Sequence, residues 1–323
     1  MQKLRQAFVS GIRQDLDLPE SLLEVLLAAL LCKEHVLLEG PPGSGKSTLA
    51  RCIGELTGSD MGRIQMNPDI TPSDILGCEV LVSSSPLQLE FREGPVFKAF
   101  LLIDEINRAM PRVQSALLQA MAERQVEVAG QNRDLHPDFW LVATQNPYDM
   151  DGTFLLPMSQ WDRFGLALEM PLPQGELLER QLKFMLGREQ KNSTVVDQTS
   201  SKATQESRLA KQKFFRDLLK MASRKSPAID SDWFRVIRGL QEHLTQNRDR
   251  GMGTRPLSLR AWTSWLNLGS CLSLLRGKDY LSTECLRELL LPALLHRCSE
   301  SRDRELGLQL LAAFDRLSGL KQG

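Results

Sequence analysis

The sequence predicts an α/β protein whose last third is all-helical, and three observations lead to this prediction. A short apolar run, His35–Glu39, is followed by a glycine-rich loop and then by a helical pattern that stops at Gly58. Further continuous apolar runs, typical of buried parallel strands, recur between helical patterns. They are Phe100–Ile103, Phe139–Thr144 and Leu166–Leu172. From Arg208 onward only helical patterns follow.

The length and composition indicate two domains. A chain of 323 residues is long enough for a core and one smaller domain. Lys191–Gln205 is rich in Ser, Thr, Gln and Lys and poor in apolar residues, as a flexible linker or inserted loop would be. We therefore expect an α/β core with N-terminal helices at 1–188, a linker at 189–207 and a helical domain at 208–323.

Charge and cysteine content exclude some functions. The 40 Lys and Arg balance the 40 Asp and Glu, which disfavours a protein whose main task is to grip nucleic acid. The six cysteines show no C-x-x-C spacing, and several fall in apolar helical runs, so we expect these to be buried free thiols, reduced as in the cytoplasm. The longest apolar run, Ser21–Leu38, is interrupted by charged residues and does not predict a membrane span.

The first elements follow from local patterns. Met1–Asp17 predicts a charged helix or arm, and a helix capped by Ser21 is expected to run to Leu31. Arg63–Asn67 predicts a second strand, and Thr71–Asp74 predicts the start of a helix.

Two β-hairpins are predicted inside the α/β alternation. Glu79–Arg92 alternates apolar and polar residues around the turn Ser83–Pro86. An amphipathic helix, Val113–Met121, precedes a second hairpin at Gln125–Asn132. Inserted hairpins of this kind more often have a function than not, although the sequence pattern alone does not show whether these two do.

The helical domain is predicted from apolar spacing in five segments, with a loop at Arg248–Pro256 before the third. The segments are Phe214–Met221, Ser231–Thr245, Ser258–Leu275, Ser282–Cys298 and Asp303–Leu320.

The glycine-rich loop has the composition and context of a phosphate-binding loop. Its glycines let backbone N–H groups turn toward a polyanion, and the following helix adds its positive end. Lys46 would reach the β- and γ-phosphates of a nucleotide, and the Ser47 hydroxyl would bind Mg²⁺. A loop of this type that binds nothing is the alternative. The loop residues are Gly40, Pro41, Pro42, Gly43, Ser44, Gly45, Lys46, Ser47 and Thr48.

Polar residues follow two of the predicted strands. Asp104 and Glu105 end the run Phe100–Ile103, where ligands bind in open parallel sheets. Asp104 suits a ligand to Mg²⁺ or its water, and Glu105 suits a base for the attacking water. Asn146 ends the next run and could position that water. The alternatives are a solvated pair of acids and a simple Asn-Pro turn.

Several motifs resemble those of MoxR-type AAA+ ATPases, over about residues 21–296. Leu101–Ala109 resembles the Walker B segment of that family, and so does Gln114–Met121 with Glu123–Val126. Ala143–Pro147 is similar to sensor 1. Three pieces, Asp151–Phe154, Leu156-Pro157 and Asp162–Phe164, are similar to the arginine-finger stretch. Ser258–Ala261 and Arg276–Tyr280 are similar to the lid and sensor 2 region.

The resemblance implies a five-stranded AAA+ core, a helical lid and a homo-oligomeric ring, expected to be a hexamer. It places the Glu79–Arg92 hairpin as an insertion in helix 2 and the Val126–Asn132 hairpin before sensor 1. By family position Arg163 is the arginine finger, acting on the neighbouring subunit's nucleotide. Arg260 is the sensor 2 candidate, with an ordinary surface arginine as the alternative.

The chain departs from the family pattern in two places besides the linker-like segment. Met158 and Ser159 stand where Glu and Ala are common, and Ser258-Leu259-Arg260 stands where Ser-Pro-Arg is usual. Neither change touches a residue needed for nucleotide chemistry, but the lid signal is weaker than the core signal.

The resemblance implies a motor or chaperone that hydrolyses Mg–ATP and remodels a protein partner. It suggests a client with a von Willebrand A-type domain and a role in maturation or metal insertion. Two alternatives are a motor subunit of a chelatase-like or nucleic-acid-directed complex, and a nucleotide-gated scaffold with little turnover. The intact set Lys46, Asp104, Glu105, Asn146 and Arg163 argues against the scaffold.

Overall fold

The computed structural model describes residues 1–84, 87–149, 152–170, 229–249, 254–299 and 304–319, with a few single positions between 172 and 217. The linker predicted at 189–207, the domain boundaries around it and most of the helix predicted at Phe214–Met221 lie outside these residues.

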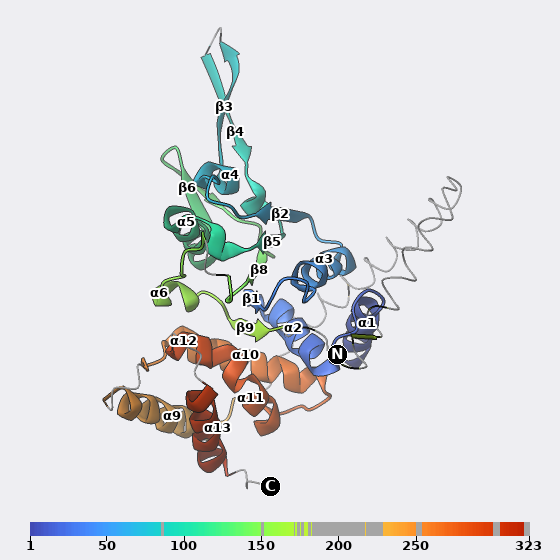
Figure 1. Ribbon diagram of the computed structural model, residues 1–323, viewed down its shortest axis with the longest axis vertical. Helices are drawn as coiled ribbons and strands as arrows, with labels where there is room; N and C mark the ends of the chain where they lie inside the picture. The colour runs from blue at the N-terminus through green and yellow to red at the C-terminus, as the bar shows by residue number, and fades with distance from the viewer. Residues whose placement is uncertain are drawn as a thin grey trace, which may run out of the picture.

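The core is a five-stranded parallel sheet, in the order β2-β5-β8-β1-β9 (Figure 1). The strands are β1 (Val36–Glu39), β2 (Met61–Gln65), β5 (Phe100–Asp104), β8 (Trp140–Gln145) and β9 (Leu166–Glu169). The three central strands, β1, β5 and β8, are buried along their whole length, as continuous apolar runs require when both faces of a sheet are covered.

Two apolar clusters cover the two faces of the sheet. Alternate residues of each strand point to opposite faces, so Leu38 and Leu102 enter one cluster, while Leu37 and Leu101 enter the other. The first cluster also holds α1 (Gln2–Arg13), α2 (Glu20–Cys32) and α3 (Lys46–Thr57). The second holds α4 (Pro72–Leu76) and α5 (Pro111–Glu123).

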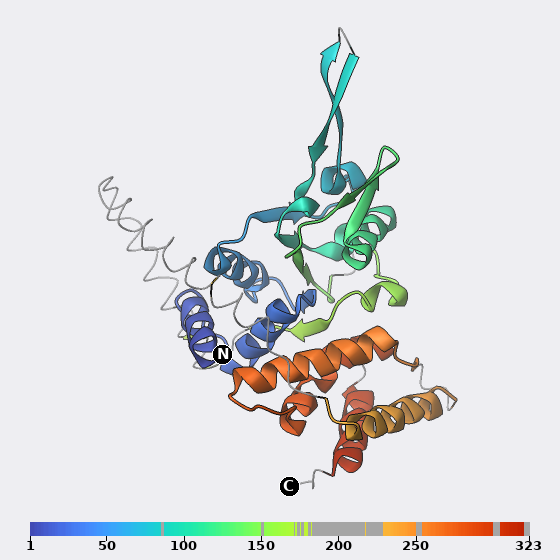
Figure 2. The same cartoon turned by 180° about the vertical axis from the view of Figure 1, so that it is seen from behind.

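Two hairpins extend from the core. The longer one, β3 (Gly77–Ser84) with β4 (Leu87–Glu93), projects far beyond the sheet (Figures 1 and 2). The strands cross closely at their base, where a Cβ on Gly77 would lie 2.2 Å from the Arg92 carbonyl oxygen. The shorter hairpin pairs β6 (Gln125–Val128) with β7 (Gln131–Asp134). Both hairpins confirm the sequence pattern.

The helices after residue 229 form a layer below the sheet in Figure 2. They are α9 (Asp232–Asp249), α10 (Leu259–Leu275), α11 (Thr283–Leu290), a π-helical turn (Leu291–Leu295), α12 (His296–Cys298) and α13 (Arg304–Ser318). The long helix α10 packs along α2, with Cys32 of α2 3.6 Å from the Asn267 carbonyl oxygen. The lid thus rests directly on the N-terminal helices.

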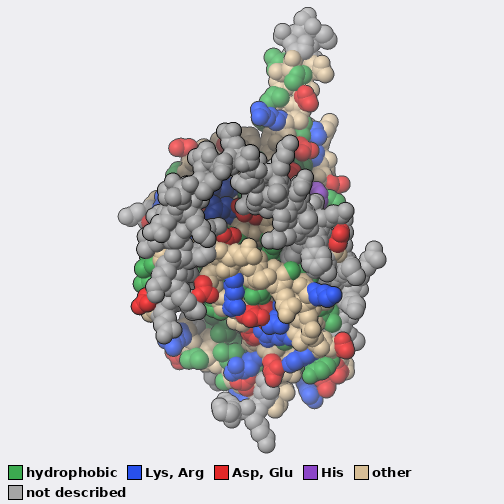
Figure 3. Space-filling model, turned by 90° about the vertical axis from the view of Figure 1, so that its right-hand side faces the viewer, with side chains coloured by type: hydrophobic (Ala, Val, Ile, Leu, Met, Phe, Trp, Pro, Cys, Tyr) green, Lys and Arg blue, Asp and Glu red, His purple; other side chains and the backbone are tan. Residues whose placement is uncertain are grey.

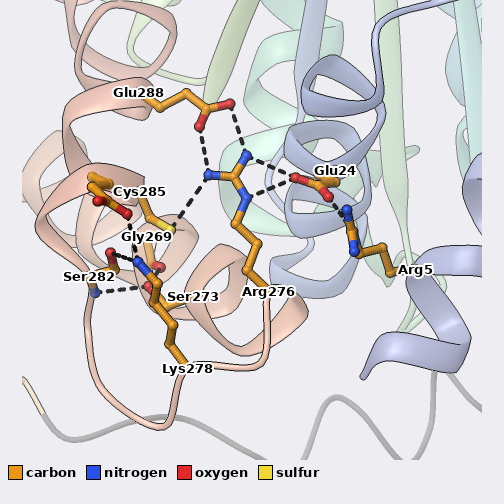
Figure 4. A network of polar contacts seen from close by, with 10 residues as sticks. Arg5, Glu24, Gly269, Ser273, Arg276, Lys278, Ser282, Cys285 and Glu288 are labelled. Carbon is orange, nitrogen blue, oxygen red and sulfur yellow. Dashed lines mark hydrogen bonds and ion pairs between the residues drawn. The ribbon is translucent and has the colours of Figure 1, made fainter.

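A buried carboxylate joins these two parts of the chain (Figure 4). Glu24 of α2 is 3% exposed and accepts hydrogen bonds from Arg5 of α1 and from Arg276 after α10, the latter at 2.8 Å. Arg276 also bonds Glu288 of α11 at 2.7 Å. Burial lowers the pKa of the Arg276 guanidinium, but its two carboxylate partners outweigh this and raise it. The network fixes the lid against α1 and α2 without leaving a buried charge unpaired.

Three sequence expectations were wrong in detail. Ser21 does not cap α2, which begins after Pro19. The predicted helix 282–298 is interrupted, because Pro292 lacks an N–H and its ring crowds the carbonyl one turn earlier, and the chain takes a π-helical turn there. Strand β9 ends at Glu169, before Leu172.

Candidate functional site

The glycine-rich loop joins the end of β1 to the start of α3. Gly43 and Gly45 have φ values of 80° and 88°, which L-residues with side chains rarely adopt. Helix α3 begins at Lys46, so its free backbone N–H groups face the loop. Lys46 Nζ donates to the carbonyl oxygens of Gly40 and Pro41, both at 2.7 Å. The lysine therefore lies inside the loop.

Asp104 ends β5 directly beside this loop. Its Oδ1 accepts a hydrogen bond of 2.5 Å from Ser47 Oγ and one of 3.4 Å from Thr144 Oγ1 of β8. Its Oδ2 accepts from Arg63 Nε of β2 at 2.9 Å. Asp104 is only 2% exposed. Its carboxylate is held by side chains from three elements, α3, β8 and β2.

Glu105 adopts a strained backbone conformation next to Asp104. Its φ of 58° is left-handed, which is uncommon for a residue with a side chain and costs about 1–2 kcal/mol. Its N–H donates to Thr144 Oγ1 at 2.9 Å. Its Oε2 is 2.9 Å from Gln65 Nε2 and 3.1 Å from Arg108 Nε. These contacts hold the carboxylate at the edge of the sheet, away from the core.

Asn146 follows β8 at the same edge. Its Oδ1 accepts the Tyr148 N–H at 3.2 Å, and its carbonyl accepts Asn107 Nδ2 at 3.3 Å. The Asn-Pro turn considered from the sequence is thus present, and it stands beside the two acids because the register places β8 next to β5.

The acids and Lys46 influence one another. Burial lowers the pKa of Lys46, while the nearby charges of Glu105 and Asp104 raise it. The two carboxylates therefore help to keep a partly desolvated ammonium group charged.

Arg163 lies at the other edge of the sheet. It stands just before β9, whose first residue pairs with Val36 at the start of β1. The Gly165 N–H donates to the His35 carbonyl at 2.8 Å, which fixes this segment at the amino ends of the strands. The phosphate loop leaves the carboxyl end of β1. One chain therefore does not bring Arg163 to its own phosphate loop.

Arg260 lies on the same side as Arg163. Its neighbour Ser258 donates to Asp162 Oδ1 at 2.9 Å. Burial raises the pKa of Glu34, and the nearby charges of Arg297 and Arg260 act in the opposite direction. Arg260 is exposed and near Glu34, before β1, so it is also separated from Lys46 within one chain.

Sequence reasoning missed the contacts that orient the acids. Arg63 and Gln65 alternate with buried residues on β2, which marks them as one face of the strand. Thr144 is a fully buried polar residue near the end of β8. That Arg63 meets Asp104, and Gln65 meets Glu105, depends on the β2–β5 register, in which Gln65 pairs with Asp104.

The residues present fit a magnesium nucleotide. A hydroxyl and a carboxylate oxygen, Ser47 Oγ and Asp104 Oδ1, meet beside the loop and are the hard ligands that Mg²⁺ prefers. A Cβ built on Gly43 would meet nothing within 4 Å, so the loop has open space in front of it. Among the described residues, no group of three His, Cys, Asp or Glu could hold a metal by itself. This agrees with an ion held largely by phosphate and water.

Comparisons with known proteins agree with this geometry. Residues 35–166 match the model of the ATPase family associated with various cellular activities (AAA). YeaC of Bacillus subtilis is 46% identical over 147 residues, 46% of this chain and 46% of YeaC. Chaperone MoxR1 of Mycobacterium tuberculosis is 39% identical over 168 residues, 52% of this chain and 44% of MoxR1. The matched segment spans slightly less than half of each relative.

The fold is shared over nearly the whole chain. A crystal structure of a Cytophaga hutchinsonii protein superposes with a TM-score of 0.75 at 23% identity, covering 97% of this chain and 94% of the other. The fold and the geometry of the site thus agree with the match of residues 35–166 to the AAA family of ATPases. Relatives that match about half of this chain include proteins named MoxR and chaperone MoxR1.

Proposed function

We propose that this chain binds Mg–ATP at the glycine-rich loop and hydrolyses it to ADP and phosphate. One observation carries the proposal: Lys46 and Ser47 at the start of α3 meet Asp104 and Glu105 at the end of β5, at the carboxyl edge of the sheet. The AAA-family match over residues 35–166 supports it.

The residues divide the chemistry as follows. Within the loop Gly40–Thr48, the backbone N–H groups of residues 43–48 would hold the phosphates, since Pro41 and Pro42 have none, and Lys46 would exchange its loop carbonyls for phosphate oxygens. Ser47 Oγ and Asp104 Oδ1 would hold Mg²⁺, while Arg63 keeps Oδ2 in place. When bound, the ion neutralises charge that builds up on the phosphates.

Glu105 would orient the attacking water and accept its proton. Gln65 and Arg108 both contact Oε2, so we assign the water contact to Oε1. Asn146, at the neighbouring strand end, would hold the same water or the γ-phosphate. The main contribution of the site is positioning and charge stabilisation rather than covalent chemistry.

Two variants separate binding from turnover. Lys46→Ala is expected to abolish tight ATP binding, because it removes the cation inside the loop. Glu105→Gln keeps the size of the side chain and leaves Asp104 in place, so we expect binding to persist and turnover to fall roughly 10²–10⁴-fold. Equilibrium binding of labelled ATP and phosphate release measure the two effects. Wild-type turnover in Glu105→Gln would remove the proposed role of that carboxylate.

We further propose that the chain works as a cytoplasmic motor or chaperone in a homo-oligomeric ring, expected to be a hexamer. A relative is named a chaperone, which supports this. The long hairpin supports client binding, since Leu81, Val82 and Leu89 are 56%, 49% and 53% exposed on it. Figure 3 shows hydrophobic and charged side chains mixed along this projection. No helix in the described part of the chain is both long and apolar enough to cross a membrane.

The client we propose is a protein with a von Willebrand A-type domain, matured or loaded with metal by the ring. Glu105→Gln, held in ATP, should retain that client during purification. A chelatase-like or nucleic-acid-directed motor is the second candidate. The zero net charge of this chain argues against the nucleic-acid-directed form. A scaffold with little turnover is the third, and the phosphate-release measurement decides against it if wild-type turnover is sustained.

A further inference from the structure

A buried arginine of the lid lies against the segment that carries Arg163. Arg297 belongs to the short helix α12, which packs against α6 (Met158–Trp161) just before that segment (Figure 1). The Arg297 side chain is only 1% exposed. Burying a guanidinium removes it from water, which is costly unless the protein replaces the lost hydrogen bonds.

The hydrogen bonds of Arg297 go to the backbone on both sides of Arg163. Its Nε and Nη2 donate to the carbonyl oxygen of Phe164 at 3.0 and 2.7 Å, and Nη2 donates to that of Asp162 at 3.4 Å. His296 Nε2 donates to the same Phe164 carbonyl at 3.0 Å. A carbonyl oxygen has two lone pairs, so its capacity as an acceptor is fully used here. Because the acceptors are main-chain atoms, these bonds fix the path of the chain through residues 162–164.

The charge beside Arg297 belongs to the same segment. Asp162 Oδ1 is 3.6 Å from Arg297 Nε, and the Asp162 carboxylate also accepts a hydrogen bond of 2.9 Å from Ser258, just before α10. Burial lowers the pKa of the Arg297 guanidinium, while the charges of Asp162 and Glu34 act in the opposite direction. Two residues of the lid therefore hold Asp162.

The core holds the chain directly after Arg163. The Phe164 side chain is fully buried in the second apolar cluster, and the Gly165 N–H donates to the His35 carbonyl at 2.8 Å. Arg163 itself is only partly buried. A well-packed apolar side chain can often replace a buried ion pair without loss of stability, so stability alone does not require an arginine at position 297. Its rigid fork of donors supplies direction instead.

We propose that Arg297 is a positioning residue for ATP hydrolysis, which acts from the lid by holding Arg163 in its working place. The inference rests on the proposed role of Arg163 and assigns a partner to that residue. A displacement of a reacting group by about 1 Å can cost about 10²-fold in rate. Binding of ATP should not depend on Arg297, because the phosphate loop lies at the other edge of the sheet.

Two substitutions of Arg297 test this by kinetics. Arg297→Met removes all the donors and keeps an unbranched apolar side chain, and we expect kcat to fall about 10²-fold while labelled ATP binds as in wild type. Arg297→Lys keeps the charge beside Asp162 but loses the fork, so its kcat should fall less. Arg276→Met is the matched control, since it removes another lid arginine that bonds the core, through Glu24. It should keep wild-type kcat.

Mixed rings distinguish a misplaced Arg163 from a general loss of structure. Arg297→Met mixed with Lys46→Ala should regain hydrolysis, because an intact phosphate loop on the first chain can meet a correctly held Arg163 from the second. Arg297→Met mixed with Arg163→Ala should not, because neither chain then presents a working Arg163. Arg163→Ala with Lys46→Ala is the reference pair. If this pair exchanges subunits and stays inactive, the proposed role of Arg163 in trans is lost.

Hydrogen exchange of the unassembled chain tests the positioning without catalysis. The Arg163 and Phe164 amides donate to the Gln160 and Trp161 carbonyls, both at 3.1 Å. They should exchange faster in both Arg297 variants than in Arg276→Met. Melting temperatures show which variants are folded, and Arg297→Lys carries the test if Arg297→Met is not.

Three results would each overturn the inference. The first is wild-type exchange of these two amides in a folded Arg297 variant, which decides the matter even if the reference pair stays inactive. The second is wild-type kcat in a folded Arg297 variant. The third is failure of Lys46→Ala chains to restore the Arg297 variants under conditions in which the reference pair recovers.

Discussion

Two histidines are buried in this chain and should make it sensitive to acid. Burial lowers the pKa of His296 to about 3, aided by the adjacent charge of Arg297, and burial likewise lowers the pKa of His35 to about 3. In the unfolded chain these histidines have ordinary pKa values near 6.5, so they bind protons at pH values where the folded chain does not. The free energy of unfolding should therefore fall below about pH 6.5, by at most about 1.4 kcal/mol per pH unit for each histidine.

This prediction is checked by urea unfolding between pH 7.5 and 5. His296→Gln can still donate a hydrogen bond to the Phe164 carbonyl, which His296 Nε2 contacts at 3.0 Å. Its stability should depend less steeply on pH than that of wild type. His136→Gln changes an exposed histidine and should leave the slope alone. Equal slopes in all three proteins would show that His296 titrates normally.

Some residues of the proposed nucleotide site could be predicted from the sequence, because the local sequence alone sets their position in the fold. Asp104 and Glu105 follow a buried strand, and Lys46 opens a helix after glycines, so their positions needed no long-range information. Arg63 and Gln65 could not be assigned in this way. Their contacts with the acids come from the pairing of β2 with β5, which the tertiary structure sets.

At the scale of elements, the two hairpins are joined at their bases. The Arg133 guanidinium of β7 lies 3.9 Å from the ring centroid of Phe91 on β4. Phe91 also meets Phe97 edge to face, at 5.7 Å between centroids. A two-stranded hairpin is marginally stable alone in water, so these contacts should hold the base of β3 and β4 in place.

Arg133→Ala should therefore loosen the long hairpin. A cation–π contact of about 0.5–1 kcal/mol implies that backbone amides of β4 exchange with solvent about two- to fivefold faster. Millisecond hydrogen exchange read by mass spectrometry measures this. Arg92→Ala removes an exposed arginine next to Phe91 in sequence and is the control. If both variants exchange alike, the contact with Phe91 does not hold the hairpin.

Element types were more predictable than element ends. Period-two alternation located both hairpins, and the helical spacing located α9, α10 and α13. The start of α2 was wrong because Ser21 matched a capping pattern, although the helix starts after Pro19. The break at Pro292 was also missed, because the apolar spacing continues through it while the backbone cannot.

At the scale of the whole molecule, the separation of Arg163 from Lys46 within one chain supports the proposal that ATP hydrolysis needs two neighbouring chains. Lys46→Ala and Arg163→Ala should each be inactive alone, since an arginine finger is worth roughly 10³–10⁵ in rate. Mixed rings should regain hydrolysis, because an intact loop on one chain can meet an intact Arg163 from its neighbour. Phosphate release at several mixing ratios measures the recovery. Fluorescent labels must confirm that subunits exchange, and exchange without recovery would contradict a role in trans.

The contact of the lid with the N-terminal helices also bears on synthesis at the ribosome. Arg276 follows Glu24 by 252 residues, and Asn267 follows Cys32 by 235. At bacterial and eukaryotic elongation rates, roughly 10–50 s pass between the synthesis of α2 and the synthesis of α10, which covers it. During that interval one apolar side of α2 lacks its final neighbour. Helix α2 therefore gains its final packing only after α10 has been translated, and a chain truncated before α10 would keep an exposed apolar surface on α2 that favours aggregation.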